Sequence, residues 1–360
     1  MSVFEIPLFW IWLCACLMGL FSRRSKWVAL VLVVVSASIV LLNVENNDTV
    51  LYLGWYSEIQ YAPFSRDWLF DALEYVFSIG GVPYGLYRLS LSIGALVLYY
   101  FGMYRISDGV KTLPMACFLL IPLWLGTTLF RTFLAGAVVC FALSFLFKEK
   151  STQRDLLAYV VLVVVAGSIH FMSYYFLVLL LARLSKKTVA SISIGITVLV
   201  LFSMFSGVAS WALSHLIGSY RVEYYLKLNI GLGSLVFIAS VLLLQLTCNE
   251  IGKSIDKHHA CDTKMKNAIS NTGLCFLPLC AVAVLNVSEI YRFLWILLPA
   301  IACLLARYCF SEEGLLGSRA SLVCGAIVWI VAMLVLAFTV HDFNLSFIPV
   351  MTNNPINSLF

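Results

Sequence analysis

Charged residues are scarce in this chain. Asp, Glu, Lys and Arg make up 11% of its 360 residues, whereas 62% are hydrophobic and the mean hydropathy is +0.98. Soluble globular domains carry about 25% charged residues, so an ordinary soluble domain is excluded. The apolar runs at 27–44 and 191–208 are continuous and lack the alternation of barrel strands. Helices satisfy their own backbone polar groups, so the composition predicts an all-α, polytopic integral membrane protein.

Motifs of soluble nucleotide and zinc enzymes are also missing. The chain has no P-loop, no dinucleotide-binding fingerprint, no His-Glu-x-x-His motif and no Cys-x-x-Cys pair. The one metal-like grouping, formed by His258, His259, Cys261 and Asp262, lies among lysines and is interpreted as a solvated loop. None of the 11 cysteines falls in a predicted outer loop, so disulfides are not expected. We expect no metal and no cofactor.

Apolar windows of about 20 residues predict roughly twelve membrane spans in a single domain over residues 1–360. The spans centre near residues 13, 35, 94, 120, 139, 162, 177, 198, 240, 277, 299 and 330. Lys and Arg are concentrated in loops between alternate spans, at 22–26, 105–111, 148–155, 184–187, 249–267 and 307–319. Because cytoplasmic loops carry the basic excess, these loops are assigned to the cytoplasm and both termini to the outside.

Three segments on the outer side are too long for simple turns, at about 46–83, 210–231 and 341–360. Within the first, residues 68–79 have apolar side chains at helical spacing but are too few to cross a bilayer. We expect a re-entrant or interfacial helix there.

A few basic residues lie against the cytoplasmic bias. Of the 23 Lys and Arg residues, 17 lie in the basic loops or, in the case of Arg183, directly beside one, and the others are Arg66, Arg88, Arg131, Arg221, Lys227 and Arg292. Arginine near a hydrocarbon boundary is unfavourable unless it faces water, a counter-charge or an anionic ligand. A single such arginine is more often a snorkelling anchor, whereas a group of them favours an anion-binding site.

Arg131, His170 and Arg292 all fall at span ends near one depth on the outer side. If their helices surround one cavity, two guanidinium groups and an imidazole converge there with a carboxylate from Asp48, Glu58 or Glu289. Such a site could bind an anion and supply a base. The alternatives are a hydrogen-bonded turn role for His170 and a solvated turn role for Asp48. The tyrosines of the first outer segment could form an interfacial belt or line a sugar-binding groove.

Several stretches, in order, resemble the EpsG-type polysaccharide polymerases. They are residues 129–135 (LFRTFLA), residues 167–173 (GSIHFMS), Asn47-Asp48 with Tyr52 and Tyr56, and residues 288–293 (SEIYRF). The chain departs from the family pattern at Thr132, where glutamine is frequent, and in its tail, which has Ile348-Pro349 and Asn354-Pro355 in place of a Pro-Tyr pair. The resemblance spans most of the chain through sparse positions.

The resemblance implies a Wzy-like polymerase for O-antigen, capsule or exopolysaccharide, with a GT-C-like helical bundle and a periplasm-facing cavity in the bacterial inner membrane. Such proteins join undecaprenyl-diphosphate-linked oligosaccharide repeats, and a flippase and a chain-length regulator are expected partners alongside membrane lipid, but no nucleic acid. Arg131 and Arg292 are expected to bind the diphosphate, and Arg221 and Arg88 are expected to assist them. The catalytic candidates are His170 as first base, Asp48 as second base and Glu289 as the residue that orients Arg292, and the sugar-binding candidates are Tyr52, Tyr56 and Tyr291.

The main alternative function is a flippase or transporter for lipid-linked sugars, which would also need an anion site at the outer leaflet. A flippase must present its site to both faces, and the chain has no ionisable residue deep in the middle of a predicted span. The polymerase is therefore favoured over the transporter.

Overall fold

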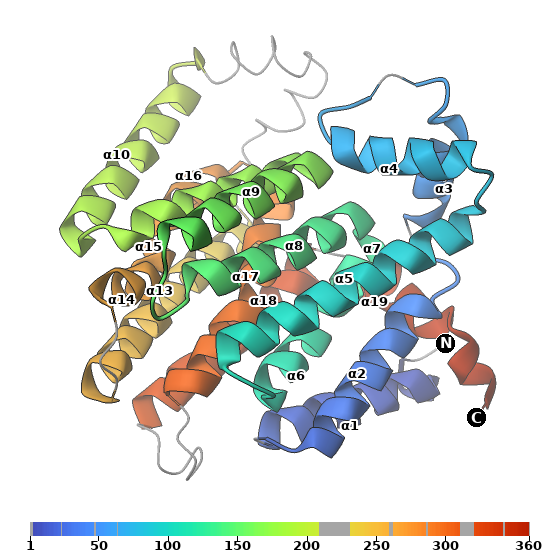
Figure 1. The fold of residues 1–360 in the computed structure, drawn as a ribbon, viewed down its shortest axis with the longest axis horizontal. Helices are drawn as coiled ribbons and strands as arrows, with labels where there is room; N and C mark the ends of the chain where they lie inside the picture. Colours follow the sequence, from blue (N-terminus) through green and yellow to red (C-terminus); the bar gives the residue numbers. More distant parts are fainter. Residues whose placement is uncertain are drawn as a thin grey trace. The chain divides into compact units, whose positions relative to one another are not determined.

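The computed structural model describes the whole chain except residues 1, 2, 23, 47, 63, 209–230, 259–261, 286, 310–319, 341, 342 and 360. Every regular element of the described residues is a helix (Figure 1), which confirms the predicted all-α class. The chain divides into two compact units. The first comprises Met1–Leu177, Trp295–Phe310 and Asp342–Phe360, and the second comprises Val178–Leu294 and Ser311–His341.

The first unit holds the N-terminal helices and the end of the chain. Its elements are η1 (Val3–Glu5), α1 (Pro7–Phe21), α2 (Lys26–Leu41), α3 (Thr49–Glu58), α4 (Trp68–Ile79), α5 (Tyr84–Ser107), α6 (Thr112–Leu120), α7 (Pro122–Thr128), α8 (Phe130–Leu146), α9 (Gln153–Ile169), α19 (Phe343–Thr352) and η4 (Pro355–Leu359).

The second unit holds α10 (Lys186–Phe205), α13 (Leu232–His258), α14 (Thr263–Ser270), α15 (Thr272–Cys275), α16 (Leu277–Ala283) and α18 (Ala320–Val340). Two elements are divided between the units. They are the 3-10 helix η2 (Phe171–Arg183) and α17 (Val287–Tyr308).

Helix α8 forms the core of the first unit, where it packs against α5 on one side and α9 on the other. A close approach of the helices requires a small residue. A Cβ atom at Gly102 of α5 would lie 3.0 Å from the backbone of Cys140 in α8, so any side chain there would force the two helices apart. This tight packing fixes the position of the first turn of α8, which carries Arg131.

Four described helices are long and apolar enough to cross a membrane. They are Tyr84–Ser107, Lys186–Phe205, Leu232–Ile255 and Glu289–Tyr308, and several helices of 10–17 residues are also apolar. All twelve predicted span centres fall in helical segments, but the count of twelve spans stays a prediction. The segments centred near 120 and 277 are broken helices, with Pro122 and Pro278 near the starts of α7 and α16. Proline supplies no N–H to continue the preceding helix.

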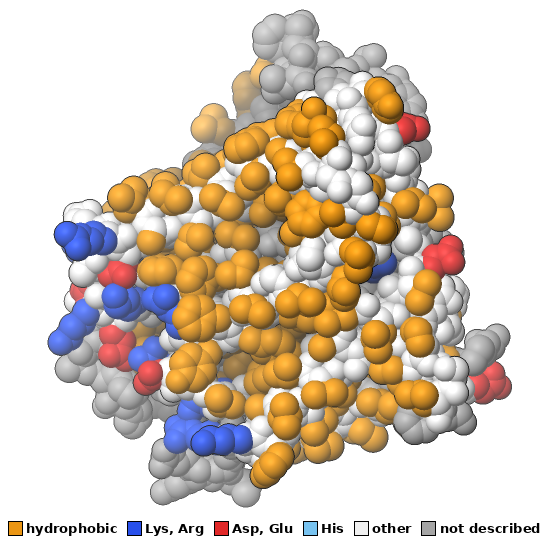
Figure 2. Space-filling view, turned by 45° about the vertical axis from the view of Figure 1, so that its right-hand side comes forward, with side chains coloured by type: hydrophobic (Ala, Val, Ile, Leu, Met, Phe, Trp, Pro, Cys, Tyr) orange, Lys and Arg blue, Asp and Glu red, His pale blue; other side chains and the backbone are white. Residues whose placement is uncertain are grey.

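Apolar side chains are abundant on the molecular surface. Helix α10 buries only Val189 and Ser193 among its 20 residues, and large apolar side chains are exposed from Ile194 to Phe205. Figure 2 shows hydrophobic side chains spread over the visible face. Soluble proteins rarely expose contiguous apolar surface on this scale, so the structure supports a protein that is embedded in lipid.

Helix α4 confirms the predicted short helix over residues 68–79. Its acidic residues face inward and several of its apolar residues face outward, which is the reverse of a surface helix in a soluble protein. Its carboxyl side chains Asp71 and Glu74 are buried, whereas Trp68, Val76 and Ile79 are exposed. At 12 residues it is too short to cross a bilayer. An apolar outer face suits contact with lipid, and the acidic inner face points carboxyl groups into the first unit.

Candidate functional site

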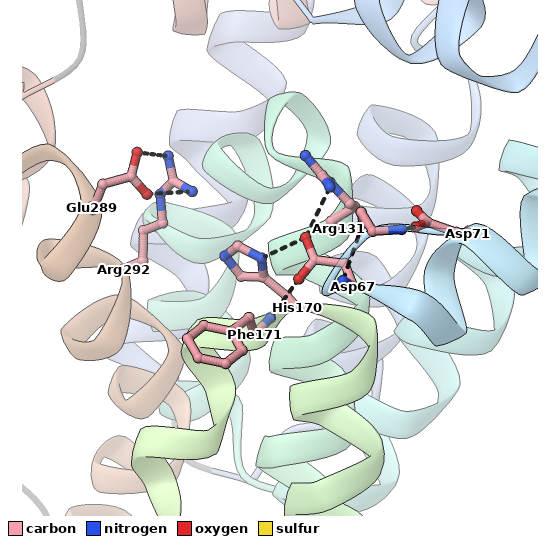
Figure 3. Close-up of polar contacts among 8 residues, drawn as sticks. Asp67, Asp71, Arg131, His170, Phe171, Glu289 and Arg292 are labelled. Carbon is pink, nitrogen blue, oxygen red and sulfur yellow. Dashed lines mark hydrogen bonds and ion pairs between the residues drawn. The ribbon is translucent and has the colours of Figure 1, made fainter. Parts of the chain in front are cut away.

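The carboxylate of Asp67 joins three segments of the first unit. Its Oδ2 accepts a hydrogen bond from Nη1 of Arg131 at 2.9 Å, and its Oδ1 accepts one from the backbone N–H of Phe171 at 2.8 Å (Figure 3). Nδ1 of His170 lies 3.8 Å from Oδ2, which is an ion-pair separation longer than a direct hydrogen bond. We call Asp67, Arg131, His170 and the Phe171 N–H the Asp67 cluster.

The start of helix α8 places Arg131 at this cluster. Helix α7 ends at Thr128, and Leu129 leaves the helical conformation with φ −89° and ψ 68°, so α8 begins anew at Phe130. A Cβ atom at Gly126 would lie 2.4 Å from the ring of Phe133, so this corner closes only around a glycine. The corner turns the second residue of α8, Arg131, toward Asp67.

Three aromatic rings surround the guanidinium group of Arg131. Its Cζ lies 4.6 Å from the ring centroid of Trp55, 5.6 Å from that of Phe70 and 5.8 Å from that of Tyr52. Cation–π contacts and the Asp67 ion pair together hold the planar group in place. The Arg131 side chain is 23% exposed, so part of the guanidinium can still reach a ligand.

The hairpin between α9 and η2 places His170. Helix α9 ends at Ile169, and His170 is extended, with φ −145° and ψ 109°. The hairpin closes tightly because a Cβ atom at Gly167 would lie 2.5 Å from the ring of Tyr174. Tyr159 fixes it further by donating a hydrogen bond of 2.6 Å to the Phe176 carbonyl. The imidazole is therefore held, largely buried, beside Asp67.

The pKa values of Asp67 and of the neighbouring Glu74 are shifted in opposite directions. Burial alone would raise the pKa of Asp67, but the imidazole of His170, the Phe171 N–H and the charge of Arg131 outweigh it and lower that pKa. Burial and the nearby Asp71 raise the pKa of Glu74 to about 8, against a smaller lowering by Arg131. Oε1 of Glu74 has no hydrogen-bond partner among the described residues, and Asp71 accepts a hydrogen bond from the N–H of Ser65.

Helix α3 carries several of the predicted residues. Asp48 is half-buried at its N-terminus, and its spacing to Tyr52 and Trp55 places all three on one helix face. Tyr52 and Tyr56, the predicted sugar-binding tyrosines, are buried, and the hydroxyl of Tyr56 donates a hydrogen bond of 2.6 Å to the Val82 carbonyl. Trp55 is the exposed aromatic residue of this face.

Arg88 lies in a buried polar network of the first unit. Its Nη2 donates to Oδ1 of Asn43 and to the carbonyl of Thr127, both at 3.3 Å, and Asn46 donates to the same carbonyl at 3.0 Å. These contacts tie α5 to the end of α7. A role for Arg88 in diphosphate binding stays a prediction.

Arg292 belongs to the second unit, on the part of α17 that precedes Trp295. Its Nη1 lies 3.1 Å from Oε2 of Glu289, and its Nη2 donates to Oε1 at 3.4 Å, so the pair is two-pronged (Figure 3). The neighbouring Tyr291 is buried, and Arg221 lies outside the described residues. That Arg131 and Arg292 face one cavity stays a prediction.

Sequence reasoning missed Asp67, which the structure places at the centre of the cluster. The residue directly precedes a correctly predicted helix, yet its side chain makes no capping hydrogen bond there. Asp67, Asp71 and Glu74 are spaced by four and then three residues, which puts three carboxyl groups on one face of an apolar helix. That spacing was the signal that could have identified the acidic inner face.

The sequence of the chain also matches a known protein family. The model of the EpsG family matches residues 9–351, nearly the whole length, including every member of the Asp67 cluster. No curated protein and no solved structure matches the chain. On the strength of the family match, the chain belongs to the EpsG family.

Proposed function

We propose that this protein joins undecaprenyl-diphosphate-linked oligosaccharide repeats into polysaccharide by glycosyl transfer. EpsG membership indicates a polysaccharide polymerase-type function, and the Asp67 cluster offers groups suited to this reaction. The bond from the anomeric carbon of the growing chain to its diphosphate breaks, and a bond from the same carbon to an acceptor hydroxyl oxygen forms. The hydroxyl proton passes to a base, and the lipid diphosphate leaves with the electron pair of the broken bond.

Arg131 is the proposed ligand for the departing diphosphate. A guanidinium fork can donate two parallel hydrogen bonds to phosphate oxygens, and these bonds strengthen as negative charge develops on the leaving group. The surrounding rings and Asp67 hold Arg131 in advance of the reaction, so little reorganisation is needed. Arg292, with Arg221 and Arg88 as aids, remains a proposed second source of positive charge.

His170 is the proposed general base, and Asp48 is the second candidate. The nearby carboxylate of Asp67 favours a proton on Nδ1 of His170, which leaves Nε2 as the nitrogen that accepts the hydroxyl proton. Asp67 is thus a positioning residue for both the imidazole and the guanidinium. Glu289 would orient Arg292 in the same way. The scheme uses no metal and no cofactor.

One observation carries the proposal. Arg131 and His170 belong to separate stretches of the sequence, and both lie within 4 Å of the same oxygen atom, Oδ2 of Asp67. A cation and a base held by one buried carboxylate form an arrangement that can stabilise a leaving anion and activate a hydroxyl. We further propose that the site faces the periplasm from the bacterial inner membrane, with a flippase and a chain-length regulator as partners.

Reconstitution tests this function directly. Purified full-length protein in liposomes is supplied with a lipid-linked repeat already on the outer leaflet, and the products are separated by size. We expect a ladder of products without any transport step. Transport of the repeat with no change in its size would identify a flippase, and a product of a single size would identify a single-addition transferase. Either result would overturn the proposed polymerase.

A further inference from the structure

We propose that Trp55 forms a stacking site for the pyranose ring that is attached directly to the donor's diphosphate. This inference rests on the proposed function and adds a sugar subsite beside the phosphate-binding Arg131. It differs from the expectation that Tyr52 and Tyr56 bind sugar, because both of those rings are buried.

Trp55 is the accessible member of the aromatic group around Arg131. Tyr52 is 6% exposed and Phe70 is 1% exposed, whereas Trp55 is 36% exposed. Trp55 also lies closest to the guanidinium group, at 4.6 Å. A ligand held by Arg131 therefore meets Trp55 before it meets either of the other rings.

The indole ring is held in place before any ligand binds. It makes an edge-to-face contact with Tyr52, with ring centroids 5.3 Å apart and planes at 90°. Tyr52 in turn makes edge-to-face contacts with Phe70 and Phe130, both at 6.2 Å. An aromatic side chain that is fixed by buried neighbours loses little conformational entropy when it binds a ligand, so its contacts contribute more fully to affinity.

The chemistry of the donor determines what lies next to Arg131. A phosphate oxygen bound by the guanidinium would lie about 3 Å from a nitrogen atom. In a glycosyl diphosphate the first sugar is bonded to that phosphate through one oxygen, so the sugar lies within one ring's width of the guanidinium. Trp55 occupies this neighbourhood, and the apolar C–H face of a pyranose suits the face of an indole ring.

Polar groups on the same helix complete a site for a sugar. Glu58 lies three residues after Trp55 and is exposed, and Asp48 lies seven residues before it. Both spacings place these carboxylates on the Trp55 face of α3, where they can accept hydrogen bonds from sugar hydroxyls. Ligand sites commonly combine an apolar wall with a few such polar groups. The ligand class is therefore a glycosyl diphosphate, not a free phosphate.

The test compares two ligands in one polymerisation assay. The first is the native lipid-linked repeat extracted from producing cells, for which KM is measured, and the second is undecaprenyl diphosphate, which carries no sugar and for which the inhibition constant is measured. Trp55→Ala should raise KM for the repeat by roughly five- to tenfold and leave the inhibition constant within about twofold. Trp55→Phe should retain most of the affinity because a ring remains.

Trp68 supplies the matched control, since it is 51% exposed on α4 and makes none of the Arg131 contacts described above. Trp68→Ala should change neither constant. The inference is overturned if Trp55→Ala leaves KM unchanged, or if it weakens both ligands equally, which would make Trp55 only a support for Arg131 or a membrane anchor. The proposed function fails separately, if wild-type protein makes no ladder or if Arg131→Ala polymerises normally.

Discussion

Arg131 and Arg292 are both paired with a carboxylate, but the two pairs differ in how they are made. Arg131 meets Asp67, which is 64 residues away in sequence, and three aromatic rings from α3 and α4 surround it. Arg292 meets Glu289 on the same helix, one turn away. The first contact exists only when the first unit is folded, whereas the second can form on a single helix.

The difference shows where the fold has fixed the geometry of a charged group. A pair separated by three residues on a helix is worth a few tenths of a kcal/mol and leaves both side chains adjustable. The Asp67 cluster, in contrast, is held by a helix corner, a hairpin and an aromatic group, so its atoms are preorganised. Preorganised donors are the ones that catalysis uses most effectively. We therefore expect the first unit to carry the larger catalytic effects.

Removing the guanidinium of Arg131 should have the largest effect. Arg131→Ala should lower the rate by about 100- to 1,000-fold and abolish long chains, because a donor to the leaving group is lost. Arg131→Lys should also be strongly impaired, since lysine cannot donate in parallel pairs. The measurement is product length in the reconstituted assay. Arg307→Lys is the matched control, because Arg307 also makes a long-range pair, at 2.7 Å to Glu149. Normal-length polymer from Arg131→Ala would remove it from the site.

If Asp67 acts by positioning His170, the rate losses caused by substituting these two residues should not be additive. His170→Ala should be nearly as severe as Arg131→Ala if the imidazole is the base, and Asp67→Asn should lower the rate by roughly 10- to 100-fold through loss of positioning. In the double variant the two losses should not multiply, because residues that act as a unit are not additive. A double variant whose loss equals the product of the single losses would show that Asp67 does not act through His170.

Loss of the carboxylate should lower the rate less for the Arg292–Glu289 pair than for the Arg131–Asp67 pair. Arg292→Ala should abolish long chains if Arg292 binds diphosphate, whereas Glu289→Gln should lower the rate by less than about tenfold, because the partner of a short-range, partly exposed pair is replaceable. Comparing Glu289→Gln with Asp67→Asn in the same assay tests the contrast between the two arginines. Equal losses from the two substitutions would mean that both carboxylates position their arginines to the same degree.

Most of the helices, but not the contacts between them, could be predicted from the sequence. Apolar runs located the helices, and the segment at 68–79 was predicted as a short helix because its spacing is local information. Arg131 and His170 could be chosen because arginine and histidine at span ends are unusual. Asp67 could not be linked to them, because Arg131 lies 64 residues away and Phe171, the neighbour of His170, lies 104 residues away, and only tertiary packing brings them together. The sequence also does not reveal that Tyr52 is buried and Trp55 is exposed on the same helix, because tertiary packing decides which side chains are covered.

The smallest predicted effect is on the pH dependence of stability, to which Asp67 and Glu74 contribute in opposite ways. Glu74 lies two turns beyond Asp67 on the same inner face. The folded pKa of Glu74 is raised to about 8, against an ordinary value of about 4.3 in an unfolded chain. Its contribution to stability is therefore complete below about pH 4.3 and is lost as the pH rises through about 8. Asp67 has a lowered pKa, so its contribution is present above its ordinary value of about 3.9 and is lost only as the pH falls through its folded value.

Between about pH 6 and about pH 9 Asp67 stays ionised, so a change in stability from these two carboxyl groups comes from Glu74 alone. Glu74→Gln keeps the shape of the side chain and removes the titration. The measurement is the thermal unfolding midpoint in detergent for wild type and variant across this range, and the difference between them cancels groups common to both. The wild-type midpoint should fall relative to that of Glu74→Gln as the pH rises. Parallel curves would mean that Glu74 reaches water or a partner and ionises normally, and the inner face of α4 would then be solvated instead of closed against the first unit.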